Sequence, residues 1–183
     1  MTGVQTCALP ILHRYRIVPV INENDSVSVE GVQIGENDRL AALIAGKVQC
    51  DLLIILSDVE GLYTADPRTT PTATLLHEVA HLTPAIEALA GGSTSGVGRG
   101  GMRSKVAAAR LATRMGAHLV IAHGTIPHVI ARLLAGEEIG TLFAGSADAR
   151  VSARKQWLGF AATPQGTLVV DDGAARALTA RGS

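Results

Sequence analysis

The segment GGSTSGVGRGGMRSK, residues 91–105, has the clearest potential for binding chemistry in this chain. Its glycines let the backbone approach a ligand closely and turn its N–H groups toward it. The segment leads into an alanine-rich helix, and a helix N-terminus favours phosphate through its partial positive charge. At this point Ser104 can donate a hydrogen bond, and Lys105 can neutralise charge on a transferred phosphoryl group. The segment therefore predicts a phosphate-binding loop.

The segment is not a P-loop of the Walker A type. That motif places Lys and Ser or Thr directly after glycine, whereas Met102 and Arg103 here precede Ser104 and Lys105. A flexible linker is the alternative that glycine content alone favours. The abrupt change into a helix that starts with lysine argues against the linker.

Two shorter polar groups follow expected strands. The sequence NEND occupies residues 22–25, and Ser57 and Asp58 follow the apolar run LLIIL. In open parallel sheets, ligands bind beyond the carboxyl ends of the strands. Asp58 could thus receive a nucleotide hydroxyl or help to organise a metal ion, although it could equally cap the following turn.

Polar residues in and after the NEND group could contact a small substrate. Asp25 is one candidate, and either Asn37 or Asp38 is the other. Taken alone, these residues could simply cap turns, because Asn and Asp do so in many proteins.

The sequence HEVAH at residues 77–81 matches the H-E-x-x-H pattern of zinc proteases. That chemistry requires both histidines on one face of a helix. Here the preceding residues alternate like a strand, and Thr83–Pro84 predicts a helix start just afterwards. We therefore expect His77 and His81 to be exposed strand and turn residues, and we expect no protein metal site.

The predicted elements alternate between strand and helix, which indicates an α/β fold. This order predicts a three-layer sandwich with a mainly parallel sheet and helices on its faces. We expect Asn37 or Asp38 to cap the first helix and Gly46 to end it. A small β-ribbon is expected at residues 26–38. Buried strands are expected at residues 16–22, 51–58, 117–124 and 140–145, and helices at 37–46, 84–92, 105–116 and 126–136.

Composition narrows the class of protein. Of the 183 residues, 47% are hydrophobic and only 3% aromatic, so a core would consist of Ala, Val, Ile and Leu. The net charge of zero offers no general electrostatic reason for binding nucleic acid or membranes. Cys7 and Cys50 are too few for a disulfide framework, which favours a reducing, cytoplasmic compartment. No apolar run reaches the length of about 18 residues that a membrane span needs.

Both ends of the chain depart from the α/β pattern. Residues 1–16 are expected to be a non-native leader, because residues 1–11 resemble a translated sequencing adapter; a genuine disordered leader is the alternative. The central unit is expected at residues 17–156. Residues 157–183 are expected to be a linker and a strand–turn–helix unit too small to bury its own core, as in a truncated second domain.

Five segments together resemble the amino acid kinase family: VPVINENDSV, GENDRLAALIA, DLLIILSDVEGLYTADPR, GVGRGGMRSKVAAARLA and GTLFA. GLYTADPR and GGMRSK are characteristic of this family, and INEND followed by GENDRLAA points to the branch that acts on glutamate. The resemblance implies ATP-dependent phosphorylation of the γ-carboxylate of L-glutamate to L-glutamyl 5-phosphate, the first step toward proline. Mg²⁺ would bridge the phosphates of ATP.

The same resemblance implies roles for individual residues. Asp25 and Asn37 would contact glutamate, Ser57 and Asp58 would lie at the nucleotide, and Lys105 would stabilise charge on the transferred phosphoryl group. It also implies a homo-oligomer and, from about Gln165, the start of a PUA domain whose truncation makes RNA binding unexpected. The nucleotide loop would comprise Arg99, Gly100, Gly101, Met102, Arg103, Ser104 and Lys105.

Two parts of the family pattern have no counterpart here: an N-terminal strand and glycine loop with a phosphate-contacting lysine, and a Gly-Ser segment that holds glutamate. We therefore expect the chain to be a fragment with little or no kinase activity alone. One alternative is another family member that acts on carbamate, acetylglutamate or aspartate. A second alternative is a non-catalytic module that binds nucleotide or RNA.

Overall fold

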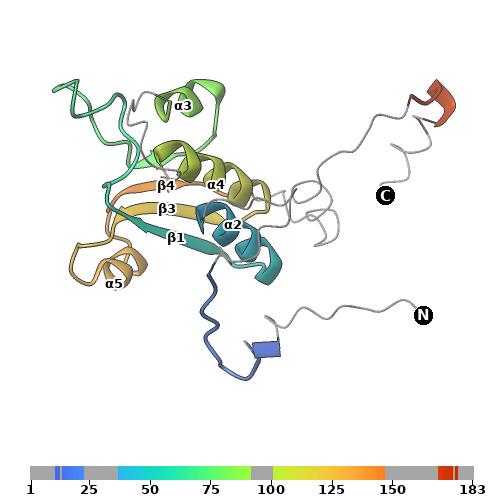
Figure 1. Ribbon diagram of the computed structural model, residues 1–183, viewed down its shortest axis with the longest axis horizontal. Coiled ribbons are helices and arrows are strands. Elements are labelled where there is room, and N and C mark those ends of the chain that lie inside the picture. Colours follow the sequence, from blue (N-terminus) through green and yellow to red (C-terminus); the bar gives the residue numbers. More distant parts are fainter. Residues whose placement is uncertain are drawn as a thin grey trace.

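The computed structural model describes residues 11–12, 14–22, 37–91, 101–146, 169–174 and 176. Within these residues, a four-stranded sheet carries helices on both faces (Figure 1). Residues 92–100 of the predicted glycine-rich segment (91–105) and most of the predicted ribbon at 26–38 lie outside the described residues. So do most of the residues 157–183, which were assigned to the linker and the second domain.

The sheet is mixed, with the strand order β1-β3-β4-β2. Strands β1 and β3 run parallel, with Leu52 opposite His118 and Ser57 opposite His123. Strands β2 and β4 are also parallel, but β4 runs antiparallel to β3. The expected mainly parallel sheet is thus confirmed for two of its three pairings. The strand bounds are Leu52–Ser57 for β1, Glu78–Val79 for β2, His118–His123 for β3 and Thr141–Phe143 for β4.

Each predicted helix in the described part is present, although its ends differ. The helix after the glycine-rich loop starts three residues earlier than expected, at Met102, and Gly116 follows its end with a φ of 85°. Thr83 caps the next helix upstream, as predicted, since its Oγ1 accepts a hydrogen bond from the Ile86 N–H at 3.3 Å. None of the described helices combines the length and apolar character needed to cross a membrane. The bounds are Asn37–Val48 for α2, Pro84–Leu89 for α3, Met102–Arg114 for α4 and Val129–Leu134 for α5.

Gly46 does not end α2, so this detail of the prediction is wrong. The helix continues to Val48, and Gln49 beyond it has a left-handed φ of 54°. Gly46 is buried instead, and a Cβ on it would overlap the Sδ atom of Met115, just after α4. The missing side chain therefore permits close helix packing rather than a helix end.

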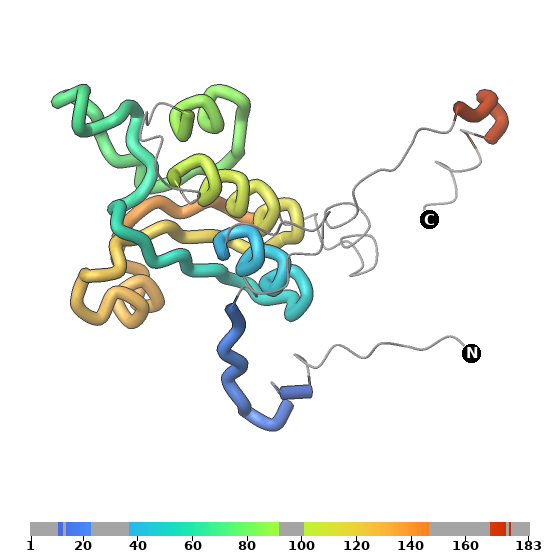
Figure 2. The backbone as a smooth tube through the Cα atoms, in the orientation of Figure 1, coloured from blue at the N-terminus to red at the C-terminus, as the bar shows by residue number. Residues whose placement is uncertain are grey.

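The buried strand predicted at residues 16–22 is also wrong for the described chain. Residues 17–22 are assigned to no strand, and Val18 and Val20 are 85% and 95% exposed. Figure 2 shows this blue segment leading away from the sheet. Pro19 lies between the two valines and has no N–H to donate to a neighbouring strand. As a result β1, expected inside the sheet, is an edge strand among the described residues.

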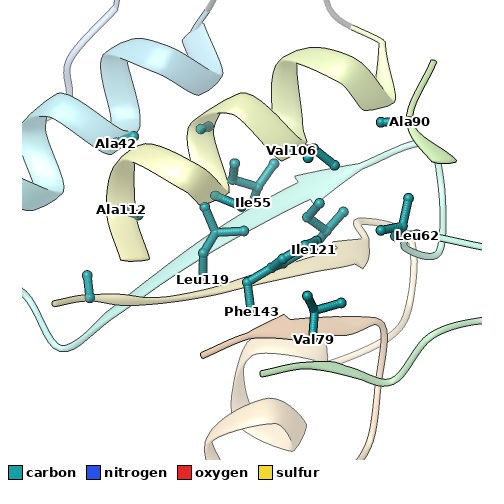
Figure 3. Close-up of a cluster of buried hydrophobic side chains, with 13 residues drawn as sticks. Ala42, Ile55, Leu62, Val79, Ala90, Val106, Ala112, Leu119, Ile121 and Phe143 are labelled. Carbon is teal, nitrogen blue, oxygen red and sulfur yellow. The ribbon is translucent and has the colours of Figure 1, made fainter. Parts of the chain in front are cut away.

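The larger hydrophobic core lies between the sheet and the helix pair α2–α4 (Figure 3). Leu119 and Ile121 of β3 point into this core, whereas Val120 and Ala122 of the same strand pack with Val129 of α5 on the other face. This alternation is the ordinary pattern of a strand covered on both sides. The helix side of the larger core is built mainly from small residues: Ala42, Val106, Ala108, Ala109 and Ala112.

Thr141 ties β4 to the segment that follows β1. Its side chain is fully buried, and its Oγ1 accepts a hydrogen bond from the Leu62 N–H at 2.8 Å. Thr141→Val keeps the shape but leaves that buried N–H without an acceptor, which costs about 1–3 kcal/mol. Urea denaturation should show a larger loss for Thr141→Val than for Thr141→Ser, which keeps the hydroxyl. Equal stability of the two variants would contradict this role.

Candidate functional site

A cavity of about 650 Å³ opens where β1 and β3 end. Its wall includes the segment that follows β1, the last residue of β3, the end of α3 and the first turn of α4. This volume lies within the range typical of sites for small molecules and cofactors. The position at the carboxyl ends of two parallel strands is the one expected from the sequence.

Lys105 supplies a buried positive charge at this cavity. It lies in the first turn of α4 and is 8% exposed. Its Nζ atom donates a hydrogen bond to Oδ2 of Asp38, in the first turn of α2, at 3.1 Å. The Ser104 hydroxyl donates to the same carboxylate oxygen at 2.8 Å. Asp38 therefore fixes the ammonium group at the cavity wall and compensates its charge.

The N-terminus of α4 suits an anion. Gly101 is the N-cap, adopts an extended backbone conformation and provides no side-chain cap for the first N–H groups of the helix. Gly101, Met102 and Lys105 all line the cavity. The helix dipole and the lysine thus favour negative charge at the same end of the cavity.

Ser57 and Asp58 form a hydrogen-bonded pair at the end of β1. The Ser57 hydroxyl donates to Oδ1 of Asp58 at 2.9 Å, and Asp58 lines the cavity. This hydrogen bond is the main reason why the pKa of Asp58 is below its ordinary value; the Asp58 backbone, Lys105 and His123 add to it. Asp58 is therefore a carboxylate at neutral pH and can receive a hydroxyl or a cation.

Ser57→Ala is expected to raise the pKa of Asp58 toward its ordinary value, because the variant removes the largest cause of the lowering. An NMR titration of the carboxyl carbons measures this directly. Asp66 serves as an internal control, since its pKa is lowered mainly by Arg68, and that shift should not change. An unchanged titration of Asp58 would show that the hydroxyl is not the cause.

The loop between β1 and β2 forms another part of the cavity wall. The Tyr63 hydroxyl donates to Glu60, and Arg68 donates to both carboxylate oxygens of Asp66 at 3.0 and 3.1 Å. All four residues line the cavity. None of these four residues was predicted as a site residue, although the motif GLYTADPR contains three of them.

The structure brings together only part of the predicted site. Asp58, Gly101, Met102 and Lys105 line one cavity, with Ser57 bonded to Asp58 and Ser104 bonded to Asp38. Asn37 and Arg103 are exposed and are not part of the cavity wall. The remaining predicted residues, Asp25, Arg99 and Gly100, lie outside the described residues.

Two features of the site were missed by reasoning from sequence. Asp38 was considered only as a substrate contact or a helix cap, and its pairing with Lys105 joins residues 67 positions apart. His123 lines the cavity but was not among the predicted site residues. The end of an apolar strand could have pointed to His123, as it did to Ser57.

The zinc-protease pattern at residues 77–81 does not form a helix. Glu78 and Val79 form strand β2, and both His77 and His81 are exposed, as predicted. Among the described residues, no group of three or more His, Cys, Asp or Glu side chains is arranged to hold a metal ion.

Known proteins similar to this chain agree on one family. The profile described as "Amino acid kinase family" matches residues 5–123, a range that begins inside the predicted leader, so the leader stays a prediction. A glutamate 5-kinase from Ectopseudomonas mendocina (strain ymp) is 52% identical over 163 residues, which cover 89% of this chain and 44% of that protein. A glutamate 5-kinase from Nitrosomonas eutropha is 51% identical over 166 residues, 91% of this chain and 44% of that protein. The chain thus spans less than half the length of these relatives.

A solved structure of a uridylate kinase from Archaeoglobus fulgidus is 26% identical, with a TM-score of 0.44 over 58% of this chain and 46% of that chain. A structural match of that size carries no argument for fold or function. The sequence comparisons do identify the family. The profile covers more than half of the chain, and it agrees with the resemblance seen in the motifs. The chain belongs to the amino acid kinase family.

Proposed function

We propose that this chain carries the nucleotide-binding part of a glutamate 5-kinase, which transfers the γ-phosphoryl group of ATP to the γ-carboxylate of L-glutamate. The observation that carries the proposal is the buried Lys105–Asp38 pair at a cavity that lies beyond parallel strands. Glutamate is the proposed substrate because about half of the aligned residues are identical to those of named glutamate 5-kinases.

The reaction would be a direct in-line transfer. An oxygen of the glutamate γ-carboxylate attacks the γ-phosphorus, the bond from that phosphorus to the bridging oxygen breaks, and ADP leaves with the electron pair. Such a transfer depends on positioning and on stabilisation of charge rather than on a covalent enzyme intermediate. Lys105 would neutralise the charge that develops on the transferred group, and Asp38 would hold its ammonium in place.

The lining of the cavity suits a nucleotide with its phosphates at the α4 end. Gly101 and Lys105 provide an anion-binding end, whereas Leu62, Leu89 and Ala90 provide an apolar part of the wall. A base would lie against the apolar part, since ligand sites are mostly apolar with a few placed polar groups.

Mg²⁺ would reach this site on the phosphates of ATP. Magnesium commonly keeps several water ligands and binds through one or two carboxylates and substrate phosphates, not through a dedicated protein cage. Asp58, an exposed carboxylate at the cavity, fits this requirement. The ion would neutralise charge on the phosphates during transfer.

The remaining parts of the proposal rest on the motifs. Asp25 and Asn37 would contact glutamate, and Arg99 and Gly100 would complete the nucleotide loop. We also propose that the full-length protein is a homo-oligomer in the cytoplasm. Within this chain, residues 17–156 would form the kinase part, and residues 157–183 would form a linker and the start of a PUA-like domain.

A chimaera tests the substrate. The segment of the Ectopseudomonas mendocina glutamate 5-kinase that matches this chain would be replaced by the chain itself, and ADP release would be measured with glutamate, aspartate, acetylglutamate and carbamate. We expect glutamate to give the highest kcat/KM. Preference for another acceptor would overturn the choice of substrate, and failure of the 183-residue chain to bind MgATP by calorimetry would overturn the nucleotide site.

A further inference from the structure

His123 lies at the cavity and is not used by the mechanism described above. It is the last residue of β3 and pairs in register with Ser57, the last residue of β1. Its side chain lines the same cavity as Asp58 and Lys105. The two strand ends thus place an imidazole beside the Ser57–Asp58 pair.

The pleat of β3 determines which way the imidazole points. Side chains along a strand alternate between the two faces of the sheet. Leu119 and Ile121 point into the core under α2 and α4, and Val120 and Ala122 point toward α5. His123 continues the first series, so it lies on the α4 face, where Lys105 and the N-terminus of α4 are also found.

A hydrogen bond from the following turn fixes the state of the ring. The backbone N–H of Thr125 donates to Nδ1 of His123 at 3.3 Å, and the Thr125 hydroxyl lies 2.9 Å from the same atom. Because a backbone N–H can only donate, Nδ1 must be the unprotonated nitrogen. The ring proton is then on Nε2, and among the described residues no hydrogen-bond partner is found for Nε2.

We propose that the Nε2–H group of His123 donates a hydrogen bond to a phosphate oxygen of the bound nucleotide. The inference rests on the nucleotide site proposed above and adds to it a second side-chain donor, in the same cavity as Lys105. A phosphate is favoured over the base because His123 shares a face of the sheet with the N-terminus of α4, the anion-binding end of the cavity. Thr125 acts through the ring as a positioning residue, since it sets which nitrogen carries the proton.

Substitutions of different length test this geometry on the 183-residue chain. The amide nitrogen of His123→Gln can reach the place of Nε2, whereas the shorter amide of His123→Asn reaches only the place of Nδ1. We expect His123→Ala and His123→Asn to bind MgATP roughly tenfold or more weakly, as for loss of a hydrogen bond to a charged group, and His123→Gln to restore much of the affinity. His81→Ala, an exposed histidine outside the cavity wall, is the matched control and should leave affinity unchanged.

Magnesium tripolyphosphate is the second probe, because it has the phosphates without the base or ribose. If His123 contacts phosphate, His123→Ala weakens tripolyphosphate and ATP by a similar factor. A loss for ATP alone, or no loss for either ligand, would overturn the inference while leaving the nucleotide site in place. If the unchanged chain does not bind tripolyphosphate, the inference about His123 is also overturned. If it does not bind MgATP, the proposed nucleotide site is overturned as well.

Discussion

Lys105→Met is expected to lower the free energy of unfolding of this chain by about 2–3 kcal/mol and to weaken MgATP binding about a hundredfold or more. The stability loss arises because the variant leaves the carboxylate of Asp38 without the ammonium that compensates it. The side chains of Lys105 and Asp38 are 10% and 16% exposed. Breaking a fully buried pair costs about 3–5 kcal/mol, and the value here is lower because Ser104 still donates to Asp38.

A double variant separates the two effects. Asp38→Asn combined with Lys105→Met has no uncompensated carboxylate, so part of the stability should return, whereas MgATP affinity should stay low. Lys47→Met, which changes an exposed lysine of α2, is the control for removal of a positive charge. Urea denaturation and calorimetry measure the two quantities. Full recovery of binding in the double variant would show that Lys105 does not contact the nucleotide.

Gly140→Ala is expected to destabilise the fold by about 3–4 kcal/mol or more and to reduce the yield of folded chain. Gly140 precedes β4 and has a φ of 77°, in the left-handed region that disfavours residues with a Cβ. A Cβ at this position would also overlap the backbone carbonyl oxygen of Ile121 in β3. A backbone atom of a central strand has little freedom to move away, so the two penalties add.

Gly136→Ala is the matched control for this effect. Gly136 has a similar φ of 86°, but a Cβ on it would meet nothing within 4 Å. It should therefore cost only the conformational penalty, about 1–2 kcal/mol. The difference between the two variants in thermal or urea denaturation measures the steric clash with β3. Equal losses would show that the strands can separate enough to admit a methyl group.

Local sequence signals predicted the elements well but not all of their surroundings. The apolar run that became β1, the Thr83–Pro84 start of α3 and the stop at Gly116 depend on neighbouring residues, and all three were predicted. The antiparallel pairing of β4 with β3 was not predicted, because the direction of a strand depends on the path of the connection before it. The role of Gly46 was also misread, because it depends on a distant residue. The side chain of Met115 occupies the space that a Cβ on residue 46 would need.

The site shows the same division between local and distant information. Ser57–Asp58 and Ser104–Lys105 are adjacent pairs, and their types and positions at element ends pointed to the cavity. The partnership of Lys105 with Asp38 depends on how α2 lies against α4, which residue spacing cannot reveal. Residue types at element ends therefore indicated where polar groups gather, and packing determined which of these groups meet.

The small residues between α2 and α4 have a consequence for motion. Ala42 on one helix and Ala108, Ala109 and Ala112 on the other are all almost fully buried, so the two backbones lie close together. Close packing at this interface leaves little free space for a shift, and the hydrogen bonds from Ser104 and Lys105 to Asp38 join the two helices at their first turns. The first turns of the two helices, which carry Asp38 and Lys105, should therefore move as one rigid body. We therefore expect that any closure of the cavity around a bound ligand would not separate Asp38 from Lys105.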